Sequence, residues 1–243
     1  MAEGDRRVCL LTGADSSFGE LFCQAMRTDY DIVAVCGEQT PAVVSQLEWF
    51  VDPFAPRTAL PENTYPVYVL RADLTAEGEP ERIADLALAR FGGVDLLVNA
   101  ATPRPDTTVS LLDADATLAD FLARCATAVA APLRLAARLA QRCWLHDPRT
   151  NRARNRNIVN VSALTGSTVA AGQAAHGAAM AALDQLTKHL AVEYSAFGVR
   201  ANALAPDRFP ERLPVEQVVR AVAELDAGEM TGRVFGVAAD TAG

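Results

Sequence analysis

The chain has 243 residues, half of them hydrophobic, which is enough for one large α/β domain with a substantial core. Its net charge of −8 argues against nucleic acid or an anionic membrane as the main partner, because both attract basic surfaces. The N-terminus is polar, no unbroken apolar run reaches the roughly 18 residues that span a bilayer, and the five cysteines lack CxxC spacing. These features predict a cytoplasmic protein without a membrane span or a metal site.

Short apolar runs alternate with amphipathic segments along the whole chain. In chain order we expect a strand at 8–11, a helix at 18–28, a strand at 31–36, a helix at 42–50, a strand at 67–70, a helix at 79–90, a strand at 94–99, a helix at 118–144, a strand at 158–162, a helix at 174–194, a strand at 200–204, a helix at 215–225 and a strand at 234–237. This order predicts a single doubly wound, Rossmann-type parallel sheet over residues 1–243, with helices on both faces.

Two segments interrupt the alternation. Residues 53–66 (PFAPRTALPENTYP) are rich in proline and are expected to form an irregular insertion of unknown role. Residues 149–156 (RTNRARNR) are basic and are expected to form a solvated loop.

The first strand leads into the turn Thr12–Gly19 (TGADSSFG). Glycines in such a turn let the backbone approach a pyrophosphate, which binds the amides at the following helix N-terminus. On its own, this turn is equally compatible with a tight connection that has no ligand.

The turn resembles the TGxxxGxG loop of the short-chain dehydrogenase/reductase family, with Ser17 at the middle glycine. Other segments resemble that family's motifs in the same order: Asp73-Leu74 its adenine contact, 97–102 (LVNAAT) its LVNNAG, 158–163 (IVNVSA) its IVNISS, 202–207 (NALAPD) its NxxxPG and 237–239 (VAA) its closing VDGG. The branch of the pteridine reductases is the nearest that we can name. The resemblance implies NAD(P) contacts at Gly13, Ser16, Ser17, Phe18, Gly19, Asp73, Leu74, Asn99 and Ala100.

The same resemblance locates the family's catalytic tetrad. There a tyrosine transfers the proton, a lysine four residues later lowers its pKa, a serine thirteen residues earlier polarises the carbonyl, and an asparagine holds a relay water. Aligning 161–166 (VSALTG) with ISSxxG places Ala163 at the serine, His176 at the tyrosine and Met180 at the lysine. Ala128 falls at the asparagine. All four positions are changed, so the family's standard mechanism is not expected here.

Further departures weaken the expected nucleotide site. The second strand ends in Cys36-Gly37-Glu38, without an aspartate for the NAD ribose or an arginine for the NADP phosphate. The substrate lid is reduced to about eight residues, 207–214. Ser162 is expected to point away from the former catalytic pocket, and Lys188 to lie on the wrong side of its helix to replace the lost lysine. NAD(P) binding is therefore expected to be weak or absent.

Three functions remain open. The first is a pseudoenzyme subunit that pairs, as a homo- or hetero-dimer or tetramer, through its fourth and fifth helices, with an active family member as one partner. The second is a repurposed enzyme in which His176 serves as acid or base in an isomerisation, a cyclisation or an NAD(P)H-dependent reduction; a neutral histidine that merely fills space is the alternative. The third is an NAD(P)-sensing binding module.

Overall fold

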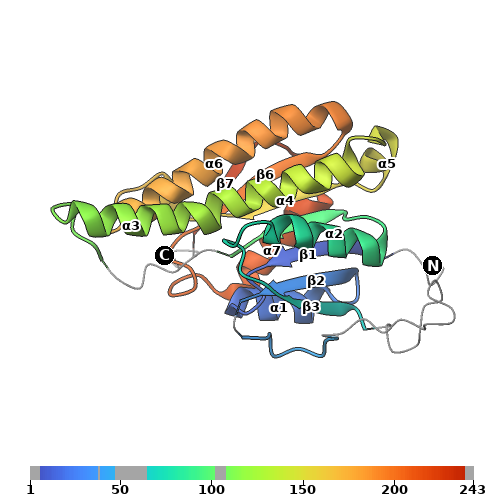
Figure 1. Cartoon of the computed structure of the whole chain (residues 1–243), viewed down its shortest axis with the longest axis horizontal. Coiled ribbons are helices and arrows are strands. Elements are labelled where there is room, and N and C mark those ends of the chain that lie inside the picture. Colours follow the sequence, from blue (N-terminus) through green and yellow to red (C-terminus); the bar gives the residue numbers. More distant parts are fainter. Residues whose placement is uncertain (1–5, 38, 47–64, 102–107, 239–243) are drawn as a thin grey trace, which may run out of the picture.

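The computed structural model describes residues 6–37, 39–46, 65–101 and 108–238, and Figure 1 shows a sheet covered by helices. The seven strands are β1 (Arg7–Thr12), β2 (Tyr30–Cys36), β3 (Val67–Arg71), β4 (Leu96–Asn99), β5 (Asn157–Val161), β6 (Arg200–Pro206) and β7 (Val234–Val237). They are all parallel and lie in the order β3-β2-β1-β4-β5-β6-β7. The predicted fold class is confirmed.

Helices cover both faces of the sheet. They are α1 (Ser17–Met26), α2 (Glu79–Phe91), α3 (Ala114–Cys125), α4 (Ala131–Leu139), α5 (Pro148–Ala153), α6 (Ala174–Tyr194) and α7 (Val215–Ala227). Strand side chains alternate between the faces: Cys9 and Leu11 pack in the core beneath α1 and α7, whereas Val8 and Leu10 pack in the core beneath α2, α4 and α6. This double burial explains why the strands are continuous apolar runs.

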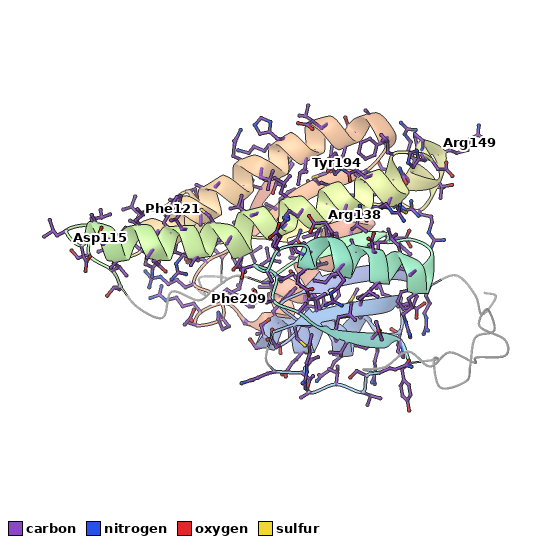
Figure 2. The ribbon with its side chains drawn as sticks, in the orientation of Figure 1. Asp115, Phe121, Arg138, Arg149, Tyr194 and Phe209 are labelled. Carbon is purple, nitrogen blue, oxygen red and sulfur yellow. The ribbon has the colours of Figure 1, made fainter. Side chains whose placement is uncertain are left out.

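The fourth predicted helix is a single helix of 31 residues, Ala114–Trp144, in which two π-helical turns, Ala126–Ala130 and Ala140–Trp144, follow α3 and α4. It begins four residues earlier than predicted because the Asp113 carboxylate accepts a hydrogen bond from the Ala116 amide and caps it. Its N-terminal end, marked by Asp115 and Phe121 in Figure 2, projects beyond the sheet.

This helix is long and apolar enough to cross a membrane, by length and composition alone. A search for unbroken apolar runs does not find this helix. Its alanine-rich sequence is interrupted by single charges, yet its mean hydropathy still reaches the required value. Core helices pass the same test, and Leu135, Leu139 and Trp144 of this helix are fully buried in the domain, although only 22% of its most apolar stretch is buried. One such helix is therefore weak support for a membrane span.

The helix predicted at 42–50 is wrong for residues 42–46, which the structure describes; residues 47–50 lie outside the described ranges, as do residues 53–64 of the insertion. Gln46 instead forms a parallel bridge with Tyr68: its amide donates to the Val67 carbonyl and its carbonyl accepts from the Val69 amide. Backbone pairing with the edge strand β3 thus replaces the helical hydrogen bonds.

The solvated loop predicted at 149–156 is also wrong. Residues 148–153 form α5, and Arg154 and Arg156 both bind the buried carboxylate of Asp95, with Nε–Oδ1 distances of 2.8 and 3.2 Å. Asp95 also accepts from the Val8 amide at 3.0 Å. Burial raises the pKa of Asp95, but these partners outweigh it and hold that pKa below its ordinary value.

Replacing Asp95 with asparagine is expected to lower the free energy of unfolding by about 3 kcal/mol, because two arginines lose their buried counter-charge. Urea unfolding measures it. The matched control is Asp85→Asn, whose carboxylate binds Arg138 on the surface between α2 and α4, and which should cost less than about 1 kcal/mol. Equal, small losses in both variants would contradict a structural role for the Asp95 pairs.

Candidate functional site

The turn between β1 and α1 is held in one conformation by its own side chains. Gly13 has φ +73°, and a Cβ there would lie 2.7 Å from the carbonyl oxygen of Ala100, so a side chain has neither the conformation nor the space it needs. The Ser16 hydroxyl accepts from the Gly19 amide at 3.1 Å and donates to the Gly13 carbonyl at 2.7 Å. The turn therefore presents the N-terminus of α1, which attracts anions.

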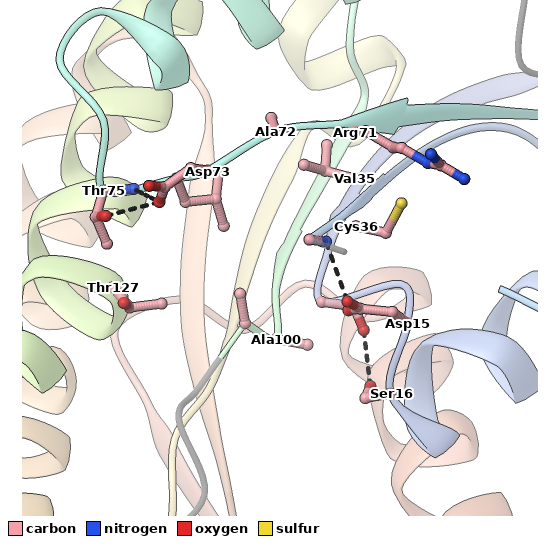
Figure 3. A pocket seen from close by; sticks show the side chains of 14 residues that line it. Asp15, Ser16, Val35, Cys36, Arg71, Ala72, Asp73, Thr75, Ala100 and Thr127 are labelled. Carbon is pink, nitrogen blue, oxygen red and sulfur yellow. Dashed lines mark hydrogen bonds between the residues drawn. The ribbon is translucent and has the colours of Figure 1, made fainter. Parts of the chain in front are cut away.

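A pocket of about 700 Å³ opens at this turn, at the carboxyl ends of β1 to β4 (Figure 3). Doubly wound sheets bind ligands at this place, where the strand order reverses between β1 and β4. Its volume falls within the range of small-molecule sites. It is lined by Gly13, Asp15, Ser16, Val35, Cys36, Gly37, Arg71, Ala72, Asp73, Leu74, Thr75, Ala100, Ala101 and Thr127.

Five of the nine residues predicted to contact a nucleotide line this pocket: Gly13, Ser16, Asp73, Leu74 and Ala100. Asp73 is fixed there by Thr75, whose amide and hydroxyl donate to its Oδ1 at 2.9 and 2.6 Å and hold the pKa of Asp73 below its ordinary value. Its carboxylate is thus available as a hydrogen-bond acceptor near neutral pH.

The other four predicted residues lie outside the pocket lining. Phe18 is buried against Phe22 in the core, so its side chain contributes packing. The Asn99 amide nitrogen donates to Asn160 across β4 and β5 at 2.8 Å. A Cβ on Gly19 would lie 2.4 Å from the Gly13 carbonyl, so this glycine permits the close packing of α1 on the turn. Ser17 is an exposed residue at the start of α1.

Sequence reasoning missed two charged residues that lie near the end of β2, Asp15 and Arg71. Asp15 reaches across from the β1–α1 turn, and its Oδ2 accepts a hydrogen bond from the Gly37 amide at 3.0 Å. Arg71 is placed beside Cys36 by the parallel register of β2 and β3. Asp15 therefore brings a carboxylate to the end of β2 from another part of the chain, besides Glu38, which lies outside the described residues. The adjacency of β1 and β2, expected for this fold, was the signal that could have found it.

The positions matched to the catalytic tetrad form an apolar cluster. Ala128, Ala179 and Met180 are buried together, and Cys125, Val129 and Ala163 pack against them. Met180 and Ala128 are each only 1% exposed. This arrangement brings three of the four predicted positions together, with no charged group among them.

The fourth position, His176, lies on α6 and is 8% exposed, and its Nδ1 is buried without a hydrogen-bond partner in the part of the chain that the structure describes. Burial lowers the pKa of His176 and the guanidinium of Arg124 lowers it further, while the Asp120 carboxylate opposes the shift. Arg124 forms an ion pair with Asp120 one turn earlier on α3, with an Nε–Oδ1 distance of 2.8 Å. His176 is therefore a neutral imidazole near neutral pH.

His176 should make the protein sensitive to mild acid. The pKa of His176 in the folded protein lies below its ordinary value, so as the pH falls the unfolded chain takes up a proton before the folded protein does. The free energy of unfolding therefore decreases as the pH drops below about 6.5, until the folded pKa is reached. Replacing His176 with phenylalanine should reduce the loss of unfolding free energy between about pH 7 and pH 5. His189→Gln, an exposed control on the same helix, should leave that loss unchanged. A loss of equal size in all three proteins would contradict the burial of His176.

Ser162 and Lys188, which were not expected to replace the lost catalytic groups, are engaged elsewhere or exposed. The Ser162 hydroxyl donates to the Leu204 carbonyl on β6 at 3.4 Å, and Lys188 is exposed. The short connection at 207–214 packs Leu213 into the core and sets the Phe209 ring against Phe18, with centroids 6.3 Å apart (Figure 2). Among the described residues, no three histidine, cysteine, aspartate or glutamate side chains are placed to hold a metal ion.

Comparison with known proteins identifies the family. A family model described as short chain dehydrogenase matches residues 7–210. The chain belongs to the short chain dehydrogenase family. Its oxidoreductase relatives include cis-4-hydroxycyclohexanecarboxylate dehydrogenase of Sinomonas cyclohexanicum, 34% identical over 56% of this chain and 51% of that protein. This chain thus aligns with about half the length of that relative. The 3-oxoacyl-acyl-carrier-protein reductase of Thermotoga maritima is 26% identical over 95% of this chain and 96% of its own length.

Solved structures agree on the fold. A 4-hydroxyisoleucine dehydrogenase complexed with NADH and succinate superposes with a TM-score of 0.72 at 20% identity, covering 97% of this chain and all of that one. A family oxidoreductase from Brucella ovis, solved with a partially ordered NAD, gives a TM-score of 0.70 at 20% identity and covers 96% of this chain and all of its own. At such identities the likeness shows the short chain dehydrogenase fold alone.

Proposed function

We propose that this short chain dehydrogenase is a non-catalytic subunit that binds an NAD-type dinucleotide without the family's proton-transfer chemistry. The observation that carries the proposal is a contrast between two places in the domain. A pocket is open beside the β1–α1 turn, whereas the positions matched to the tetrad are filled by an apolar cluster.

The residues of the pocket fit a dinucleotide. Gly13 leaves room that a Cβ would fill, and Ser16 fixes the turn so that the N-terminus of α1 faces the pocket and can bind a pyrophosphate. Asp73 and Leu74 line the pocket, and the family resemblance assigns them to the adenine ring. A bound nicotinamide would supply hydride-transfer chemistry; the proton needed for a carbonyl reduction would have to come from a side chain of this protein or from water.

The residues of the apolar cluster cannot supply that proton. Ala128, Ala163 and Met180 have no titratable group and no hydrogen-bond donor in their side chains. Removing one proton-transfer group typically slows an enzyme by roughly 10²- to 10⁴-fold, and here the whole unit is replaced. His176 is the only titratable residue among the four, and its buried Nδ1 has no described partner that would tune it as an acid.

Assembly through the helices α3, α4 and α6 completes the proposal. Leu118, Leu122 and Leu133 on the long helix and Val192 on α6 are between 43% and 75% exposed, and alanines surround them. Small and apolar side chains on an exposed helix face favour contact with another chain. A second copy or an active family member is the expected partner, and the molar mass in solution tests the pairing. A cytoplasmic location and a single domain stay predictions.

A repurposed enzyme is the second candidate. The observation in its favour is the neutral imidazole of His176, whose buried Nδ1 has no described partner and whose pKa responds to Arg124 and Asp120. It requires His176 to be a catalytic base or acid, so His176→Ala would abolish an activity that the non-catalytic proposal does not expect.

Calorimetric titration of the purified chain with NADH and NADPH tests the proposal. Micromolar binding of at least one of them is expected, which is tighter than the sequence alone suggests, because the structure has a pocket beside the β1–α1 turn. If neither nucleotide binds at millimolar concentration, the proposal fails, and a vestigial cleft in a purely structural subunit takes its place.

A further inference from the structure

The carboxylate of Asp15 lies next to the end of β2, although Asp15 does not belong to that strand. Asp15 belongs to the β1–α1 turn, yet its Oδ2 accepts from the amide of Gly37, directly after β2 (Figure 3). A Cβ at position 37 would lie 3.4 Å from that oxygen, which is contact distance, so Asp15 packs directly against Gly37. The hydrogen bond fixes the acid at the rim of the pocket.

The end of β2 is the place where a doubly wound fold distinguishes its nucleotides. An acid there accepts hydrogen bonds from the 2′-hydroxyl of the adenosine ribose, whereas an arginine accommodates a 2′-phosphate. Asp15 retains an acceptor for this purpose: among the described residues, its Oδ1 has no hydrogen-bond partner. The negative charge of this carboxylate would repel a 2′-phosphate.

Arg71 is the competing determinant, since it lines the same pocket. Its guanidinium extends past Cys36 on the side away from Asp15 (Figure 3), and the residue is exposed. To bind a phosphate at Gly37, Arg71 would have to give up side-chain freedom, while Asp15 is already held in place. The role assigned to Asp15 therefore rests on its hydrogen bond to Gly37, whereas Arg71 is an exposed residue of the same pocket.

We propose that Asp15, an acid contributed by the β1–α1 turn rather than by β2, selects NAD(H) over NADP(H). This inference rests on the proposed binding of a dinucleotide in this pocket. It assigns a specificity-determining role to a residue that lies outside β2, and it predicts a preference for NADH of roughly tenfold or more.

The experiment is calorimetric titration of NADH and NADPH into the wild-type chain and into three variants. Asp15→Asn keeps the shape and the acceptor for Gly37 but removes the charge, and it should raise NADPH affinity about tenfold while changing NADH affinity by less than about threefold. Asp73→Asn, an acid of the same pocket, should change both affinities equally. Arg71→Gln should leave the preference for NADH in place.

The outcomes separate the two proposals. If neither nucleotide binds the wild-type chain, dinucleotide binding itself fails and the inference falls with it. If NADPH binds the wild-type chain as tightly as NADH, or if Asp15→Asn leaves the ratio of affinities unchanged, the role of Asp15 is overturned while dinucleotide binding stands. A preference for NADPH that disappears in Arg71→Gln would assign the selection to Arg71 instead.

Discussion

Replacing Gly13 with alanine is expected to lower NADH affinity at least about 100-fold and the free energy of unfolding by about 2 kcal/mol or more. The left-handed backbone at φ +73° penalises any side chain, and the new Cβ would collide with the Ala100 carbonyl 2.7 Å away. To avoid that collision, either the β1–α1 turn or the end of β4 has to move, and both line the pocket. Titration with NADH and urea unfolding measure the two effects.

Gly78→Ala provides the matched control for Gly13→Ala. Gly78 has φ +79° but no atom within 4 Å of its hypothetical Cβ, so this variant carries only the conformational penalty of about 1–2 kcal/mol. Its NADH affinity should equal that of the wild type, since it lies at the start of α2. An undiminished affinity in Gly13→Ala would show that the phosphate turn does not hold the nucleotide.

Restoring a lysine at position 180 is expected to destabilise the protein by about 4 kcal/mol at neutral pH. The apolar cluster itself contains no charged residue, and burial raises the pKa of Asp184, the acid one turn later on α6, so burial should lower the pKa of the new ammonium by roughly 3 units or more. Because the folded pKa then lies below the unfolded value of about 10.4, the penalty is absent above that pH and grows as the pH falls toward the folded pKa. Urea unfolding at a series of pH values measures it.

Met180→Leu is the control for this substitution, because it conserves volume and should cost less than about 1.5 kcal/mol at every pH. The difference between the two variants isolates the charge. A Met180→Lys protein as stable as the wild type at neutral pH would mean that this position is hydrated and polar, and the apolar cluster would no longer exclude the family's chemistry.

The sequence predicted the sheet because each central strand is buried on both faces and so consists of consecutive apolar residues. It also predicted the loss of the catalytic groups at positions 128, 163 and 180, because alanine and methionine carry no proton-transfer group wherever their side chains lie. It failed at Ala42–Gln46, where a helical pattern competes with backbone pairing to Tyr68 on the edge strand. Such pairing depends on the position of β3 in space, which a local pattern does not contain.

Charged residues were harder to place than apolar ones. Arg154 and Arg156 were predicted to lie in a solvated loop. Their partner, Asp95, lies about 60 residues earlier in the chain and is buried. Asp15 was likewise overlooked because its hydrogen bond reaches Gly37, a residue 22 positions away. In both cases the contact is created by the adjacency of parallel strands, so the fold has to be assembled before the charge can be interpreted.

The most direct test of the central claim is to follow nicotinamide absorbance after the purified chain has been saturated with NADH and mixed with a panel of aldehydes and ketones. The account predicts bound NADH that is not consumed beyond the rate without protein, in the wild type and in His176→Ala alike. Consumption of NADH by the wild type that His176→Ala abolishes would contradict the non-catalytic proposal and establish His176 as a replacement catalytic residue.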